Sequence, residues 1–100
     1  MDPAIPNIYV LDVVVSTAGR DQGSLYYVIS TDELFLMLVN GKDRTLDKPK
    51  RKKRRHVQKV LRSETRVAAK LISGDKVLNS ELRRDLAYFA REMQANNLGG

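Results

Sequence analysis

The segment from residue 48 to residue 55 constrains this chain more than any other part of it. Seven of its eight residues are cations, in the order Lys-Pro-Lys-Arg-Lys-Lys-Arg-Arg. Because unpaired charges are very costly to bury in an apolar core, we expect this segment to lie outside the core. We therefore predict a folded body that carries residues 48–56 as an exposed basic loop.

The positive charge of the chain is concentrated around this segment. The whole chain has a formal net charge of +6, whereas residues 42–62 contain eleven basic and two acidic residues, a net charge of +9. The remainder is slightly acidic. A basic stretch on an acidic body indicates a polyanionic partner, with nucleic acid first and an anionic membrane second. A solvated, unstructured charge run and a nuclear-localisation signal are the alternatives.

The composition excludes several classes of chemistry. One hundred residues, 42% of them hydrophobic, suit one domain with a small core. The chain has no cysteine and a single histidine, His56, so zinc motifs are excluded and nothing positions a catalytic triad. No apolar run reaches the roughly 18 residues that span a bilayer, and residues 1–6 lack the basic start of a secretory signal. We expect a cytoplasmic, non-catalytic protein with no metal, cofactor, small-molecule substrate or membrane partner.

The first half of the chain has the pattern of short strands. Runs of β-branched and apolar residues are typical of strands, and the Asn40-Gly41 pair predicts a hairpin turn. Pro49 should end the fourth strand, because proline cannot donate to a ladder. Five short strands in about fifty residues favour a small barrel over an open sheet. The predicted strands cover residues 10–15, 25–29, 34–39, 44–46 and 56–61.

The second half of the chain changes to helical periodicity. Ser63 is placed to cap a helix over residues 64–72, and Gly74 to end it. A second helix should begin at a cap on Asn79 or Ser80 and end near residue 96. Its apolar residues recur at steps of three and four and form one stripe, which we expect to pack on the barrel or the first helix rather than on a partner. The stripe consists of Leu78, Leu82, Leu86, Phe89 and Met93.

A loop with two glycines separates the first two predicted strands. Gly19 and Gly23 permit positive φ angles and a close approach of the backbone to a ligand. Arg20 would extend a cation from this loop, and Asp21 could brace the turn through side-chain hydrogen bonds. A hairpin that uses its glycines for geometry alone is the other interpretation.

Residues 13–29, Val-Val-Val-Ser-Thr-Ala-Gly-Arg-Asp-Gln-Gly-Ser-Leu-Tyr-Tyr-Val-Ile, resemble the KOW motif, a strand–loop–strand unit with a glycine-centred loop. Residues 41–57, in which Leu-Asp-Lys-Pro-Lys precedes the other basic residues and His56-Val57, are similar to bacterial KOW-domain RNA-binding proteins. Those proteins resemble the archaeal and eukaryotic large-subunit ribosomal protein called L-fourteen-e. Leu11-Asp12 stands where that family often has a glycine before the first strand.

The sequence patterns and the resemblance together predict a mainly β fold with C-terminal α-helices. An SH3-like five-stranded barrel would cover residues 9–62, between an N-terminal tail (1–8) and a helical extension (63–96) with a final tail (97–100). The resemblance also implies binding of ribosomal RNA, association with the ribosome and contacts with large-subunit ribosomal proteins. A transcription-elongation KOW module that contacts a protein partner is the alternative. The candidate RNA-binding residues are Gly19, Arg20, Asp21, Gly23, Lys42, Arg44, Lys48, Lys50, Arg51, Lys52, Lys53, Arg54, Arg55 and His56.

Overall fold

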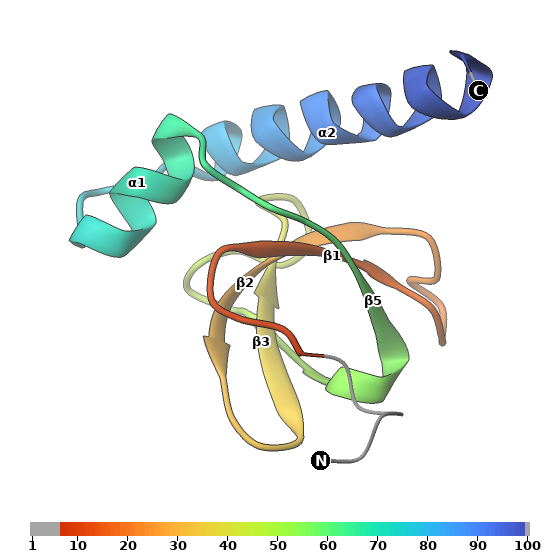
Figure 1. The fold of residues 1–100 in the computed structure, drawn as a ribbon. Coiled ribbons are helices and arrows are strands. Elements are labelled where there is room, and N and C mark those ends of the chain that lie inside the picture. The colour runs from red at the N-terminus through yellow and green to blue at the C-terminus, as the bar shows by residue number, and fades with distance from the viewer. Residues whose placement is uncertain (1–6, 100) are drawn as a thin grey trace.

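A computed structural model describes residues 7–99, with the side chains of residues 7–95, as a five-stranded antiparallel sheet followed by two helices (Figure 1). The mainly β fold with C-terminal helices is therefore confirmed. The strands are joined in the order β4-β3-β2-β1-β5. They are β1 (Asp12–Ser16), β2 (Leu25–Thr31), β3 (Phe35–Val39), β4 (Lys50–Lys53) and β5 (Val57–Arg62). A 3-10 helix, η1 (Arg54–His56), joins β4 to β5, and helices α1 (Arg66–Ser73) and α2 (Asn79–Gly99) follow.

Two irregularities bend this sheet. The register of β1 against β5 shifts between Val13 and Val14, and that of β2 against β3 shifts between Val28 and Ser30. An extra residue in one strand increases the local twist and bends the strand. The short sheet therefore curls, and the helices lie on one side of it (Figure 1). The other face encloses a cluster of apolar side chains.

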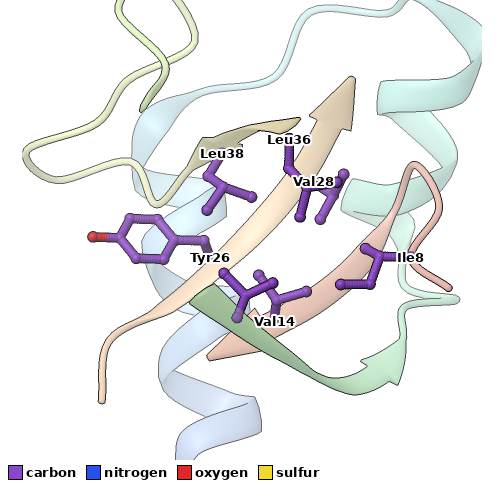
Figure 2. Packing of buried hydrophobic residues seen from close by; sticks show 7 residues of the cluster. Ile8, Val14, Tyr26, Val28, Leu36 and Leu38 are labelled. Atoms are coloured by element: carbon purple, nitrogen blue, oxygen red, sulfur yellow. The ribbon is translucent and has the colours of Figure 1, made fainter. Parts of the chain in front are cut away.

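The enclosed face holds a cluster of seven buried apolar residues (Figure 2). Side chains alternate between the two faces of a strand, which is why every second residue of β2 and β3 contributes. Ile8 belongs to this cluster and is 1% exposed, although the sequence analysis assigns it to an N-terminal tail. The other six members are Val14, Tyr26, Val28, Leu36, Leu38 and Val57.

The opposite face of the sheet packs against the helices. Three residues of the predicted α2 stripe, Leu82, Leu86 and Phe89, are buried in one cluster with Val13, Tyr27, Val39 and Val67. The predicted packing of the stripe on the sheet is confirmed for these three residues. Leu78, by contrast, is exposed, and Met93 is half-buried. Burying a Leu or Phe side chain contributes roughly 1.5–3 kcal/mol, so this contact is a main attachment of the helical layer.

A buried polar network also attaches the helices to the sheet. The Tyr27 hydroxyl donates to the Asp85 carboxylate at 2.5 Å and lies 2.7 Å from the Ser63 hydroxyl. Thr65 donates to the same Asp85 oxygen at 2.6 Å. Burial and the bond to Asp85 raise the pKa of Tyr27 to about 12. The network joins β2 to the start of α1 and to α2.

The predicted end of α1 is confirmed, whereas its predicted cap is not. The predicted cap on Ser63 is wrong: the Ser63 hydroxyl is engaged by Tyr27, and Thr65 caps α1 by accepting from the backbone N–H of Ala68 at 3.2 Å. Gly74 ends the helix as predicted, in the left-handed conformation with φ of 80°.

Helix α2 differs from the sequence analysis at both ends. It already includes Asn79 and Ser80, so neither residue is its cap. Instead, the Glu81 carboxylate accepts from the backbone N–H of Leu78 at 3.4 Å, just before the first helical residue. The helix also continues to Gly99 rather than ending near residue 96. The asparagines and glycine there lower helix propensity without removing a backbone donor, as a proline would. No helix among residues 7–99 is long and apolar enough to cross a membrane.

The fourth strand is not where the sequence pattern puts it. Residues 44–46 form no strand, and the basic residues Lys50–Lys53 form β4 themselves, so the prediction of an exposed basic loop over 48–56 is wrong. Asn40 explains the shift, because its side-chain oxygen accepts from the N–H groups of Lys42 and Arg44 at 2.9 and 3.0 Å. These bonds widen the expected Asn-Gly hairpin into a longer loop. Strand β4 lies at one end of the sheet order, where lysine is well tolerated.

Candidate nucleic-acid interface

Strand β4 carries cations on both of its faces. Side chains alternate along a strand, and Lys50 and Lys52 lie opposite β3 residues of the enclosed cluster. They therefore extend toward the enclosed side of the sheet. Arg51 and Lys53 lie on the other face and are exposed. The basic segment is thus divided into two pairs with different surroundings.

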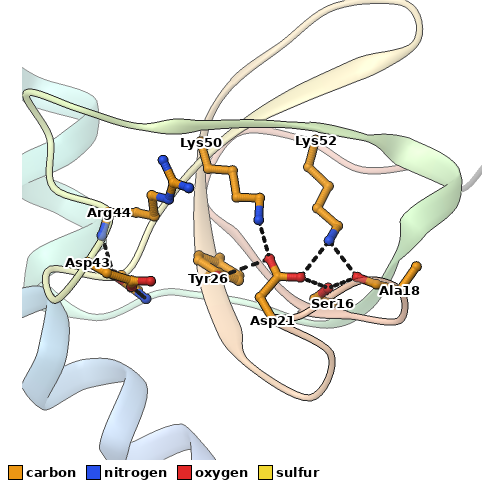
Figure 3. A network of polar contacts seen from close by, with 9 residues as sticks. Ser16, Ala18, Asp21, Tyr26, Asp43, Arg44, Lys50 and Lys52 are labelled. Carbon is orange, nitrogen blue, oxygen red and sulfur yellow. Dashed lines mark hydrogen bonds and ion pairs between the residues drawn. The ribbon is translucent and has the colours of Figure 1, made fainter.

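Lys50 and Lys52 both bind Asp21, in the loop between β1 and β2 (Figure 3). Their Nζ atoms lie 2.8 and 2.7 Å from the two carboxylate oxygens, and Lys52 also donates to the Ala18 carbonyl at 2.8 Å. The side chains of Asp21 and Lys52 are only 12% and 8% exposed, so salt screens this pair weakly. We call Asp21, Lys50 and Lys52 the Asp21 junction. It brings together the glycine loop and the basic segment, which the sequence singles out separately.

Asp21 is held as a carboxylate by four donors. Besides the two lysines, Ser16 donates to it at 2.9 Å and Tyr26 at 3.1 Å. Burial alone would raise the pKa of Asp21, but these hydrogen bonds outweigh it and hold the pKa well below its ordinary value. Burial and the neighbouring carboxylate raise the pKa of Tyr26 to about 12. Asp21 braces the loop, as the sequence analysis expects, and does so by binding β4.

The two loop glycines have backbone angles that favour glycine. Gly19 and Gly23 have φ of 86° and 90°, in the left-handed region. No atom lies within 4 Å of the position that a Cβ would take at Gly23. The backbone angle, and not a lack of space, therefore favours glycine there. This side of the loop is open to a ligand.

Two further candidates of the sequence analysis hold the fold together. The Arg54 guanidinium donates to the carbonyls of Asp32 at 2.9 Å and Ile8 at 3.0 Å, which links η1 to the β2–β3 turn and to the chain before β1. The His56 carbonyl accepts from the backbone N–H of Thr17 at 2.9 Å. Arg54, through its side chain, and His56, through its backbone carbonyl, therefore tie η1 to neighbouring parts of the fold.

Five exposed candidate cations lie on the β1–β2 loop, just before β4, on β4 and on η1, and we call them the cationic edge: Arg20, Lys48, Arg51, Lys53 and Arg55. Arg51 stacks on a phenylalanine ring. Within the part of the chain whose side chains are described, the other four make no side-chain ion pair or hydrogen bond. A row of cations on an end strand also prevents pairing with another sheet. That role accounts for charge on β4 but not for Arg20 or Arg55.

The last two candidates belong to the loop between β3 and β4. Arg44 is half-buried, and its carbonyl closes the turn by accepting from the N–H groups of Asn40 and Gly41. Lys42 is exposed and lines an open groove of about 340 Å³ together with Gly23 and Arg83 of α2. Arg83 is not among the candidates from the sequence, because the helical pattern does not tell which polar residue of α2 reaches a loop of the sheet.

The described residues contain no group of three or more His, Asp or Glu side chains placed to hold a metal ion. No protein-family model matches this chain, and no curated protein matches its sequence. This surface combines several exposed cations, a glycine loop that is open on one side, and a largely covered carboxylate, Asp21, that fixes the loop against the strand.

Proposed function

We propose that this protein is a non-catalytic RNA-binding protein whose ligand is ribosomal RNA of the large subunit. The interface consists of the β1–β2 loop, β4 and η1. The Asp21 junction carries this proposal, because it pins the loop that bears Arg20 against the strand that bears Arg51 and Lys53. Phosphates that contact such a surface neutralise its cations and release condensed counterions. The glycines let the loop backbone come close to the RNA.

We further propose that the sheet is an SH3-like barrel of the KOW type. Five short antiparallel strands, two register shifts and a 3-10 helix between β4 and β5 support this architecture. In this proposal the ion pairs of Lys50 and Lys52 with Asp21 close the gap between β4 and the β1–β2 loop. Leu11 adds support: its φ is 77°, an angle that glycine adopts freely, and it stands where the resembling family often has glycine.

Binding to the ribosome would be mainly electrostatic. The centre of the α2 stripe is occupied by the sheet, which leaves Leu82, Leu86 and Phe89 unavailable to a ribosomal protein. We therefore expect the protein to sediment with the large ribosomal subunit at low salt and to leave it at high salt, because each neutralised phosphate adds to the salt dependence. A tagged protein found only with RNA polymerase would favour the transcription-elongation alternative instead.

The direct test changes three residues of the cationic edge and leaves the Asp21 junction intact. The variant Arg20→Gln, Lys53→Gln and Arg55→Gln removes three exposed charges without touching Lys50 or Lys52. If each cation contacts a phosphate, the slope of log affinity against log salt for a ribosomal RNA fragment should flatten by about 2–3. Affinity at low salt should fall accordingly.

A matched control carries the same change in charge on the helical layer. Arg66, Lys76 and Arg91 are exposed and make no side-chain ion pair or hydrogen bond with the described residues. Changing these three to glutamine should leave the salt slope unchanged, because they lie on α1, α2 and their connection. Equal losses in both variants would mean that net charge alone drives binding and would refute the proposed interface.

A further inference from the structure

An arginine stacks on a phenylalanine at the exposed face of the β3–β4 pair. The Arg51 guanidinium carbon lies 3.7 Å from the centre of the Phe35 ring. Arg51 is exposed, although one face of its planar guanidinium lies on this ring. Lys53 is the direct cross-strand neighbour of Phe35. A flat cation on an aromatic ring, with a further cation beside it, therefore lies at the cationic edge.

The backbone of Phe35 is held in place by Asp32. Asp32 accepts from the backbone N–H groups of Leu34 at 3.0 Å and of Phe35 at 2.7 Å. These two bonds, with smaller contributions from the charges of Arg51 and Arg54, lower the pKa of Asp32. The turn between β2 and β3 is therefore fixed, and it sets the position of the ring beneath Arg51.

The ring of Phe35 contributes little to the core. It is half-buried and belongs to neither of the two buried clusters. Leu34, the residue before it, is 55% exposed. Aromatic and apolar side chains among exposed cations are typical of surfaces that bind unpaired nucleic acid, since every base has a face that can stack.

We infer that Arg51 and Phe35 form a stacking platform for an unpaired RNA base. The base lies on the open face of the Arg51 guanidinium, and Lys53 and Arg55 bind the phosphates on either side of it. This inference rests on the proposed RNA binding and specifies its ligand. Bases within a duplex already stack on one another, whereas bases in loops and bulges are free to stack on a guanidinium plane. The platform therefore selects unpaired RNA over duplex RNA.

The experiment compares two RNAs and two variants by fluorescence anisotropy. One RNA is an unpaired oligonucleotide of about 12 nucleotides, and the other is the blunt duplex that it forms with its complement. Arg51→Lys keeps the charge but loses the plane, and Phe35→Leu keeps an apolar side chain but loses the ring. Each variant should lose roughly 5- to 150-fold in affinity for the unpaired RNA. Affinity for the duplex should stay nearly constant.

A control variant and a reporter variant distinguish the loss of a contact with RNA from a loss of folding. Met37→Leu alters the residue opposite Arg51 on the same face and should change neither affinity. The chain contains no tryptophan, so Phe35→Trp introduces a single emitting residue at the platform. Its emission should change when the unpaired RNA binds and not when the duplex binds. That readout does not depend on the stability of Phe35→Leu.

The outcomes separate the inference from the proposal on which it rests. The stacking platform is overturned if the variants lose equal affinity for the two RNAs. It is also overturned if they lose affinity for neither RNA and the emission of Phe35→Trp does not change. In both cases the protein still binds RNA. A wild-type protein that binds neither RNA overturns both.

Discussion

Replacing Asp21 by asparagine should destabilise the fold, although the residue lies in a loop. The substitution keeps the size of the side chain and removes its charge. Lys50 and Lys52 would then lose the carboxylate that lies 2.8 and 2.7 Å away. The β1–β2 loop would remain bonded to the end of β1, because the Gly23 N–H still donates to the Ser16 carbonyl at 2.8 Å. The change therefore measures the contribution of the Asp21 junction itself.

The expected magnitude follows from burial. Removing one partner of a buried ion pair costs about 3–5 kcal/mol. Lys50 is 27% exposed and can turn toward water, and Lys52 keeps the Ala18 carbonyl as an acceptor. We therefore expect a loss of about 2–4 kcal/mol. A chain of this length has a total stability of roughly 5–15 kcal/mol, so the melting temperature should fall by about 10–30 °C.

The assay is urea unfolding followed by circular dichroism at neutral pH. Asp47→Asn is the matched control, because Asp47 is exposed and makes no side-chain ion pair or hydrogen bond with the described residues. It should change the free energy of unfolding by less than about 0.5 kcal/mol. A loss for Asp21→Asn no larger than that of Asp47→Asn would refute the reasoning.

The pH dependence gives a second check. The folded pKa of Asp21 lies below its ordinary value. The carboxylate therefore contributes stability that is fully present above the unfolded pKa of about 4 and is lost as the pH falls through the folded pKa. The difference in unfolding free energy between wild type and Asp21→Asn should be constant near neutral pH and shrink below about pH 4. A difference that persists undiminished in strong acid would contradict the assigned ion pairs.

Three further changes test other parts of the structure. Gly41→Ala should lower the free energy of unfolding in urea by about 2–4 kcal/mol, because φ is 76° and the new Cβ would clash with the Asn79 carbonyl oxygen at the start of α2. Asp85→Asn should lower the pKa of Tyr27 from about 12, measured by ultraviolet titration; an unchanged value would exclude the Asp85 hydrogen bond as a cause. Gly23→Val should lower the melting temperature more than Gly19→Ala does, since a β-branched side chain is strained at φ of 90°.

Local sequence patterns predict most of the elements. The apolar runs before Ser16 and after Ser24 form strands, because β-branched and aromatic residues suit a half-buried pleated surface. Gly74 ends α1 because it adopts positive φ without strain. The pattern fails at residues 44–46 and at β4, where the hydrogen bonds of Asn40 and the pairing with β3 outweigh local propensity.

The sequence by itself determined that this protein has a strongly basic segment that an apolar core could not accept unpaired, a loop that needs glycine, and a helix with one apolar stripe. These features follow from composition and spacing, which act locally. Only the tertiary structure decided what each cation does. Lys50 and Lys52 serve the fold while Arg51 and Lys53 remain exposed, because strand alternation turns the first pair toward Asp21. That carboxylate lies far away in the sequence, and no local pattern indicates which lysine will meet it.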